Sequence, residues 1–212
     1  MNFLDFKNTF QGFPVFSTLD IRKYDPGFNV RNLVRWQDKR YLLRIRNNWY
    51  TFSDQRWEEV LLFWAANRIY APSYISLESA LSYYHLIPEG VFSIQSVSPL
   101  KTNLFQTPIG NFQYSNVKPF WFFGYQMVKI QQFYAAVAEP EKALLDLLYL
   151  RPELETAVQF EALRLNMFEL KSLFNPERFE TYVQASNNKA LSARALNLML
   201  FIQNYHSHAD IS

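Results

Sequence analysis

Within residues 17–52 the hydrophobic period of the chain changes from that of helices to that of strands. Residues 17–24 predict a short helix, because the capping residue Ser17 is followed three positions later by the acid Asp20. Asp25-Pro26-Gly27 ends that helix in a tight turn. The closely spaced capping and turn signals therefore predict only short elements on either side of the turn.

A second helix is predicted over residues 29–40. Four of its side chains fall within one arc of roughly 100°, which we expect to face the interior: Val30, Leu33, Val34 and Gln37. Three basic side chains spaced by four residues occupy the opposite side, with Asn32 beside them: Arg31, Arg35 and Lys39. The pattern therefore indicates an amphipathic helix with a basic outer face.

A β-hairpin is predicted after the second helix. Residues 41–46 alternate like a strand, Asn47-Asn48 can supply a two-residue turn, and residues 49–52 return as a second strand. A first helix is expected over residues 2–11, where apolar side chains partly follow the helical spacing. This order is typical of a winged helix-turn-helix, to which we assign residues 1–55.

Positive charge is concentrated in the same segment. Residues 20–46 hold eight lysines and arginines against three aspartates, a formal charge of +5, whereas the whole chain carries +2. A basic segment on an otherwise nearly neutral chain suggests a polyanionic partner. A solvated charged surface without a partner is the alternative interpretation of the charge.

Double-stranded DNA is the partner that the predicted fold favours. A helix fits the major groove, where arginine bonds guanine in bidentate fashion and asparagine bonds adenine. We expect three side chains of the second helix to read bases: Arg31, Asn32 and Arg35. Three others are better placed to hold phosphates: Lys39, Arg44 and Arg46. Small winged helices also dock proteins, which leaves a protein-docking module as the alternative.

Residues 56–212 predict a second, larger α+β domain. Ser53-Asp54 is expected to cap a helix, and a further helix is expected over residues 74–86. Residues 91–138 are rich in Phe, Tyr, Val and Thr and are broken by turn signals, which predicts four or five antiparallel strands. Residues 140–205 have helical patterns. The fold class is therefore α+β, a winged helix-turn-helix followed by an antiparallel sheet with C-terminal helices.

No set of residues predicts catalysis. The chain has no cysteine, which excludes thiolate metal sites and cysteine nucleophiles, and its three histidines leave little scope for zinc. Its five glycines form no phosphate-binding loop. Glu169-Leu170-Lys171 matches a fragment of some nucleases but lies in a helical pattern, and Asp146 is expected on the exposed side of its helix. We therefore expect no catalytic residue, no bound metal, no cofactor and no enzymatic activity.

The chain is expected to be cytoplasmic. Its first residues lack a basic segment followed by a long apolar run, so no signal peptide is predicted. No stretch approaches the roughly 18 uninterrupted apolar residues of a membrane span, so no membrane partner is expected. The lack of cysteine fits a reducing compartment.

Four segments of the second domain carry a family resemblance. They are residues 74–81 (YISLESAL) running on to 86–89 (LIPE), 107–114 (TPIGNFQY), 122–125 (FFGY) and 138–146 (AEPEKALLD). These motif segments resemble, in content and order, signatures of the AbiEi-type antitoxins of bacterial abortive-infection systems, in which a winged helix also comes first. His85 stands where relatives often have glycine.

The resemblance implies a DNA-binding N-terminal domain that represses its own operon. It also implies a C-terminal domain that opposes a toxin resembling a nucleotidyltransferase. In this type IV class the antitoxin need not form a stable complex with the toxin, so direct binding stays open. Two other classes remain as alternatives: a free-standing winged-helix transcriptional regulator whose second domain binds a ligand or dimerises, and a nuclease-like enzyme.

Overall fold

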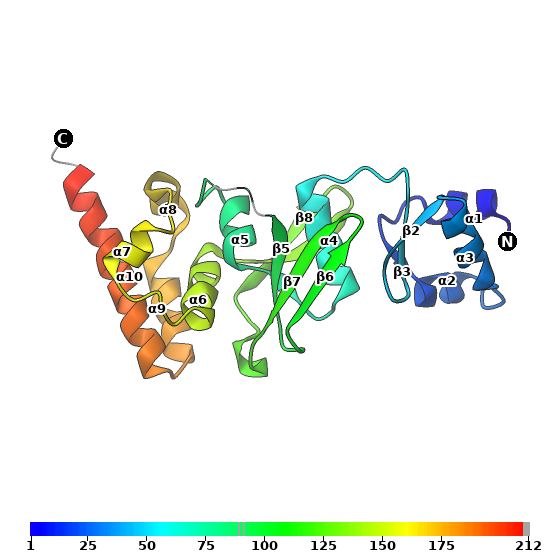
Figure 1. The fold of residues 1–212 in the computed structure, drawn as a ribbon. Helices are drawn as coiled ribbons and strands as arrows, with labels where there is room; N and C mark the ends of the chain where they lie inside the picture. The colour runs from blue at the N-terminus through cyan, green and yellow to red at the C-terminus, as the bar shows by residue number, and fades with distance from the viewer. Residues whose placement is uncertain (89, 91, 210–212) are drawn as a thin grey trace.

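The computed structural model describes residues 1–88, 90 and 92–209 of the chain. It contains helices and two sheets, which confirms the mixed α+β class. Figure 1 shows the N-terminal elements at one end, the larger sheet in the middle and the last helices at the other end. Glu89, the last residue of the first motif segment, lies outside the described residues.

The N-terminal part combines three helices with a three-stranded sheet. Its elements are α1 (Phe3–Phe10), β1 (Phe16–Ser17), α2 (Thr18–Tyr24), α3 (Arg31–Asp38), β2 (Leu42–Arg46) and β3 (Trp49–Phe52). The strands lie in the order β1-β3-β2 and all pair antiparallel. Each helix and strand predicted for residues 2–52 is therefore present, and the two-residue strand β1 is added to the hairpin.

Local signals set the ends of these elements as predicted. The hydroxyl of Ser17 accepts a hydrogen bond from the Asp20 backbone at 3.1 Å, and the Asp20 carboxylate accepts one from the Ser17 backbone at 2.9 Å. This reciprocal pair is the capping box that begins α2. At the hairpin turn Asn48 has a φ of 65°, a left-handed conformation that asparagine tolerates.

Buried apolar side chains form two clusters. The first is mostly aromatic and lies within the N-terminal part: Phe6, Phe10, Phe16, Ile21, Phe28, Leu33, Trp36, Leu42, Tyr50 and Phe52. The second extends through the larger sheet and the C-terminal helices, and it also includes Val15 and Ile45. The N-terminal part therefore packs against the rest of the chain, and a domain boundary at residue 55 stays a prediction.

Helix α4 (Glu59–Ile69) begins later than the sequence predicts. The Ser53 hydroxyl donates to the Arg40 carbonyl at 2.6 Å, and the Asp54 carboxylate pairs with the Lys7 ammonium at 2.5 Å. Both side chains are held by the N-terminal part and neither caps α4. The prediction of a cap at Ser53-Asp54 was therefore wrong.

The larger sheet has six strands among the described residues, in the order β6-β7-β5-β4-β9-β8. The strands are β4 (Tyr74–Ile75), β5 (Ser93–Ser98), β6 (Asn103–Thr107), β7 (Gly110–Asn116), β8 (Tyr125–Ile130) and β9 (Phe133–Ala138). Two pairs, β5 with β7 and β4 with β9, are parallel, so the prediction of an antiparallel sheet was wrong. The strand that follows β5 in the chain, β6, does not pair with it. Instead β6 pairs antiparallel with β7, and β7 lies beside β5 and runs in the same direction.

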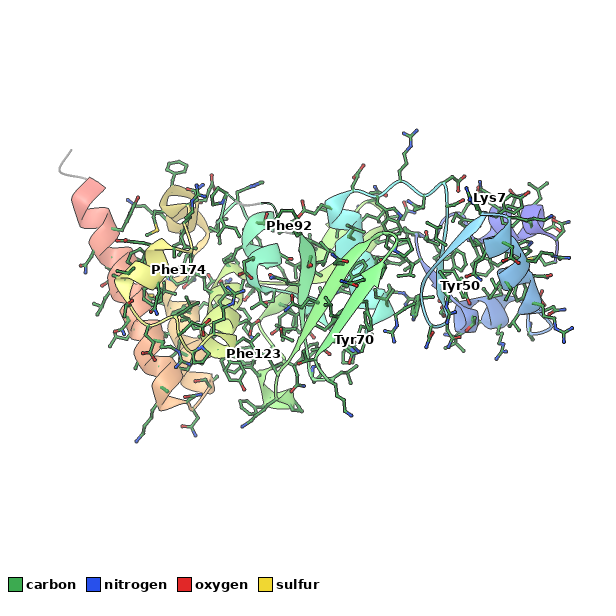
Figure 2. All side chains as sticks on the ribbon, viewed as in Figure 1. Lys7, Tyr50, Tyr70, Phe92, Phe123 and Phe174 are labelled. Atoms are coloured by element: carbon green, nitrogen blue, oxygen red, sulfur yellow. The ribbon has the colours of Figure 1, made fainter. Side chains whose placement is uncertain are left out.

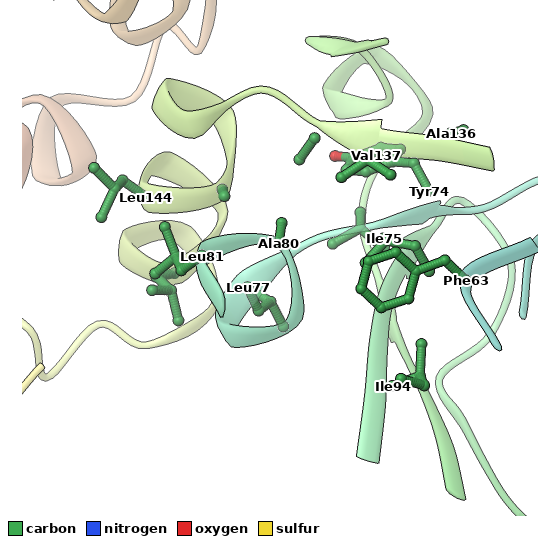
Figure 3. Packing of buried hydrophobic residues seen from close by; sticks show 14 of the residues in the cluster. Phe63, Tyr74, Ile75, Leu77, Ala80, Leu81, Ile94, Ala136, Val137 and Leu144 are labelled. Atoms are coloured by element: carbon green, nitrogen blue, oxygen red, sulfur yellow. The ribbon is translucent and has the colours of Figure 1, made fainter. Parts of the chain in front are cut away.

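Helices cover both faces of this sheet. They are α4, α5 (Leu77–Tyr83) and α6 (Pro140–Leu150). The later helices lie beyond α6, at the far end from the N-terminus (Figure 1): α7 (Ala157–Glu161), α8 (Met167–Leu173), α9 (Pro176–Ala185) and α10 (Lys189–Ala209). A short 3-10 turn spans Pro119–Trp121. Tyr114 donates to a backbone carbonyl of α4 at 2.8 Å, whereas Tyr74 donates to Asp146 of α6 at 2.9 Å. Figure 3 shows Phe63 of α4 beside Ile75, with α5 and α6 on the other side of the sheet. Residues 74 and 75 thus form a strand, not the start of a helix as predicted.

Helix α5 ends at Tyr83, and His85, two residues further on, has a left-handed φ of 57°. The Leu86 N–H donates to the Leu81 carbonyl at 2.8 Å, and the His85 N–H donates to the Ser82 carbonyl at 2.9 Å. These two bonds define a Schellman motif with His85 at the position that glycine usually occupies.

Candidate nucleic-acid interface

Two buried side chains anchor α3. Leu33 and Trp36 are 2% and 3% exposed, and the Trp36 ring lies 4.7 Å from the Phe6 ring and 5.8 Å from the Phe28 ring, centroid to centroid. Trp36 is the largest apolar side chain on the helix, so its burial fixes the rotation of α3 about its axis. The side of α3 opposite these residues faces solvent.

The rotation of α3 differs from the prediction. Val30 and Val34 are 42% and 59% exposed, and Gln37 is half-buried, so the prediction that they face the interior with Leu33 was wrong for the two valines. Trp36 lies outside the predicted arc, and burying an indole outweighs burying either valine. Val34 therefore belongs to the outer face of α3. Its apolar side chain led the sequence pattern to predict the inner face.

Four of the six predicted DNA-contacting side chains are exposed to solvent. Arg31, Arg35, Lys39 and Arg44 are exposed, and Asn32 is half-buried. None of these four cations forms a salt bridge with a described residue. Their charge is therefore uncompensated and open to an anionic partner.

Hydrogen bonds to neighbouring amides orient two of these arginines. Arg35 Nη2 donates to Asn32 Oδ1 at 2.7 Å, which brings together two of the side chains predicted to read bases. Arg44 Nη2 donates to the side-chain oxygen of Asn47 in the hairpin turn. Asn47, which the sequence predicted only as a turn residue, therefore also contributes to this basic surface.

Arg46 lies apart from the other five. Its side chain is half-buried, and its Nη1 donates to the backbone carbonyl of Ile69 at the end of α4, at 2.5 Å. Its guanidinium carbon also lies 5.7 Å from the ring centroid of Tyr70, the residue that directly follows α4 (Figure 2). Arg46 therefore joins the hairpin to the residues at the end of α4.

A second cluster of polar side chains is buried in the larger domain. The Asp146 carboxylate accepts hydrogen bonds from Ser76 Oγ at 2.7 Å, Trp121 Nε1 at 2.7 Å and Tyr74 OH at 2.9 Å, and from the Lys142 ammonium. All five side chains are buried, so the prediction that Asp146 is exposed was wrong. Helix α6 is covered by the sheet, α5 and the later helices, which leaves no solvated side at this position.

Burial shifts the ionisation of the buried cluster. It lowers the pKa of Lys142, although the Asp146 carboxylate opposes the change. Burial and the neighbouring Asp146 together raise the pKa of Tyr74 well above its ordinary value. Because Tyr74, Lys142 and Asp146 are 0% exposed, no substrate reaches them, and we assign the cluster to the stability of the fold.

Three of the four motif segments meet at this buried cluster. The first contributes Tyr74 and Ser76, and the fourth contributes Lys142 and Asp146. The third contributes Gly124, which has a φ of 72° and whose missing Cβ would lie 2.9 Å from the Cγ of Lys142. These five residues of the motif segments are therefore explained by packing around one buried ion pair.

Other kinds of site receive no support from the described residues. No three histidine, aspartate or glutamate side chains among them are grouped so as to hold a metal ion. The same ranges contain no helix long and apolar enough to cross a bilayer.

Two comparisons with known proteins give no match. No protein-family model matches the chain, and no curated protein matches it. The feature of the structure that bears on function is therefore the exposed basic surface of α3 and the hairpin.

Proposed function

We propose that the chain binds double-stranded DNA through the outer face of α3 and the tip of the β2–β3 hairpin. The observation that carries this proposal is a set of exposed cations that form no salt bridge with any described residue: Arg31, Arg35, Lys39 and Arg44. The element order α1-β1-α2-α3-β2-β3 supports a winged helix-turn-helix, in which the helix before the hairpin enters the major groove.

The side chains divide into two roles in this proposal. Arg31 and Arg35 read guanine and Asn32 reads adenine, while the exposed Val34 contacts a thymine methyl group. Lys39 and Arg44 hold phosphates on either side of the groove. Arg46 has no DNA contact, because its guanidinium is held by the second domain.

The resemblance in the motif segments supports a more specific role. We propose that the bound DNA is the promoter of the chain's own operon and that the chain is a cytoplasmic type IV antitoxin of the AbiEi type. Its second domain would then oppose a nucleotidyltransferase-like toxin. The free-standing regulator is the alternative, and a toxin reading frame directly downstream distinguishes the two.

Promoter binding tests the proposal directly. Fluorescence anisotropy with labelled promoter DNA measures the affinity of the wild-type chain and of an Arg31→Ala/Arg35→Ala variant. Each lost bidentate contact is expected to cost about 1–3 kcal/mol and to relax specificity at one base pair. Lys129→Ala removes an exposed lysine of β8 and is the matched control. Unchanged affinity in the folded double variant would refute the proposal.

A growth assay tests the antitoxic role. Cells that express the downstream toxin are expected to recover when the full chain is co-expressed. Recovery should persist with the Arg31→Ala/Arg35→Ala variant supplied from an unrelated promoter, because protection is assigned to the second domain. Loss of protection in that folded variant would move the antitoxic role to the DNA-binding surface.

A further inference from the structure

A cavity of about 450 Å³ opens where the N-terminal part meets α4. The side chains of its walls that matter here are Phe10 of α1, Phe13 of the following loop, Asp20, Lys23 and Tyr24 of α2, and Arg68 of α4. The volume falls within the range of sites for small organic ligands, roughly 300–1,000 Å³. Neither the sequence patterns nor the proposed DNA contacts use this cavity.

Aromatic rings form the apolar part of the cavity. Phe10 is 4% exposed, whereas Phe13 and Tyr24 are 49% and 64% exposed. Their ring centroids lie 6.3 Å and 5.9 Å from that of Phe10. Exposed aromatic rings around a buried one offer stacking and edge contacts to a flat aromatic ligand.

Two contacts from the second domain hold this region in place. Arg68 lies 3.4 Å from the Asp20 carboxylate, between α4 and α2. Gln132, in the turn after β8, donates to the Gly12 carbonyl at 3.4 Å in the loop that carries Phe13. The cavity is therefore formed by both parts of the chain.

Among the described residues, the charges at the cavity leave Lys23 without an ion-pair partner. Asp20 is committed, because its carboxylate accepts hydrogen bonds from the Ser17 hydroxyl at 2.7 Å and the Ser17 backbone at 2.9 Å besides pairing with Arg68. Lys23 is exposed and forms no salt bridge with any described residue. Lys23 and Arg68 against Asp20 give the cavity a net positive charge, which favours an anionic ligand.

We propose that this cavity binds a planar aromatic anion, with its rings against Phe13 and Tyr24 and its anionic group at Lys23. Arg68 closes the cavity from the side of α4. This proposal is independent of DNA binding, since none of its residues lies on the outer face of α3.

Two fluorescent probes that differ in charge test the proposal with the full chain. The anionic probe is 1-anilinonaphthalene-8-sulfonate, and N-phenyl-1-naphthylamine has the same ring system without the sulfonate. We expect saturable binding of the anionic probe at one site. Lys23→Gln should weaken it about fivefold, the upper value for an exposed ion pair, and leave the neutral probe unchanged. Tyr24→Ala and Phe13→Ala should weaken both probes.

Control measurements make each outcome decisive. Lys129→Gln removes a distant exposed lysine and should change neither affinity. Circular dichroism and thermal melting establish that each variant is folded. If the Phe13→Ala variant is unfolded, the Tyr24→Ala variant alone tests the aromatic contacts. The proposal is overturned by non-saturable binding, by wild-type affinity in the Tyr24→Ala variant, or by an equal loss of both probes in the Lys23→Gln variant.

Discussion

The guanidinium carbon of Arg46 lies 4.3 Å from the ring centroid of Phe105, on the edge strand of the larger sheet. Regular alternation along β2 would place Arg44 and Arg46 on the same side of the strand. The pairing of β2 with β3 shifts register between these two arginines, and such an irregularity redirects side chains. Arg44 therefore stays in solvent while Arg46 reaches the larger sheet and the end of α4.

The two arginines of the hairpin should respond differently to removal. Arg44→Ala is expected to lower the salt dependence of DNA binding by about 0.9 in the log–log slope, the value for one phosphate contact. Arg46→Ala should leave that slope unchanged and lower the free energy of unfolding by about 1–3 kcal/mol, because it loses a charged hydrogen bond and ring contacts. Anisotropy titrations at several salt concentrations and urea unfolding measure the two effects. Equal slopes for the two variants would contradict this division.

The end of α5 offers a stabilising substitution. His85 has a φ of 57° at the C′ position of a Schellman motif, where a side chain with a Cβ is strained. His85→Gly is therefore expected to raise the free energy of unfolding by about 0.5–1 kcal/mol, after the greater chain entropy of glycine is offset. His85→Ala keeps the Cβ and should give no gain. Thermal unfolding compares the two, and a gain from alanine as large as from glycine would exclude backbone strain as the cause.

Short-range signals predicted the N-terminal part well. The Ser17 cap and the turn at Asp25-Pro26-Gly27 act on neighbouring backbone groups, so the sequence alone sets them. The rotation of α3 was not predictable in this way. It depends on the contact of Trp36 with the ring of Phe6. Phe6 belongs to α1, so this contact forms only when α1 and α3 pack together.

The buried cluster was missed for a similar reason. The donors to Asp146 come from a strand, a 3-10 turn and its own helix, so their convergence depends on the parallel placement of β4 beside β9. One local signal was available. Lys142 and Asp146 are four residues apart in a helix otherwise rich in leucine, a spacing that places the two side chains together.

Removing the two charges of this cluster should have unequal effects. Asp146→Asn leaves the Lys142 ammonium buried without a charged partner and is expected to cost about 3–5 kcal/mol of unfolding free energy. Lys142→Met should cost less, because Asp146 keeps the donors Tyr74, Ser76 and Trp121. Urea unfolding at neutral pH measures both variants. A larger loss for Lys142→Met would show that the ammonium, and not the carboxylate, organises the cluster.

Alkaline pH should destabilise the fold through Tyr84. Burial raises the pKa of Tyr84 to about 12, against an ordinary value of 10.0 in the unfolded chain. Between these values the folded state keeps a proton that the unfolded state loses, so this stability is complete below about pH 10 and falls as the pH rises to about 12. Tyr84→Phe should reduce the fall in unfolding free energy between pH 9 and pH 11. Tyr134→Phe, at a 55% exposed tyrosine, is the control, and an identical pH dependence in wild type and Tyr84→Phe would contradict the assignment.

Gly124 should be the least replaceable glycine of the chain's described residues. A Cβ at this position would lie 2.9 Å from Lys142 Cγ and 3.1 Å from Lys142 Cβ, and its φ of 72° adds backbone strain. Gly124→Ala is therefore expected to cost about 2 kcal/mol or more, whereas Gly12→Ala, where no atom lies within 4 Å of the added Cβ, should change stability by less than about 0.5 kcal/mol. The cause can be isolated with Lys142→Ala, which removes the Cγ and Cδ that the new methyl group would strike. The Gly124→Ala/Lys142→Ala variant should lose less stability than the sum of the two single losses, because part of each loss arises from the same contact. Additive losses in urea unfolding would show that Gly124 is required for its backbone conformation and not to make room for Lys142.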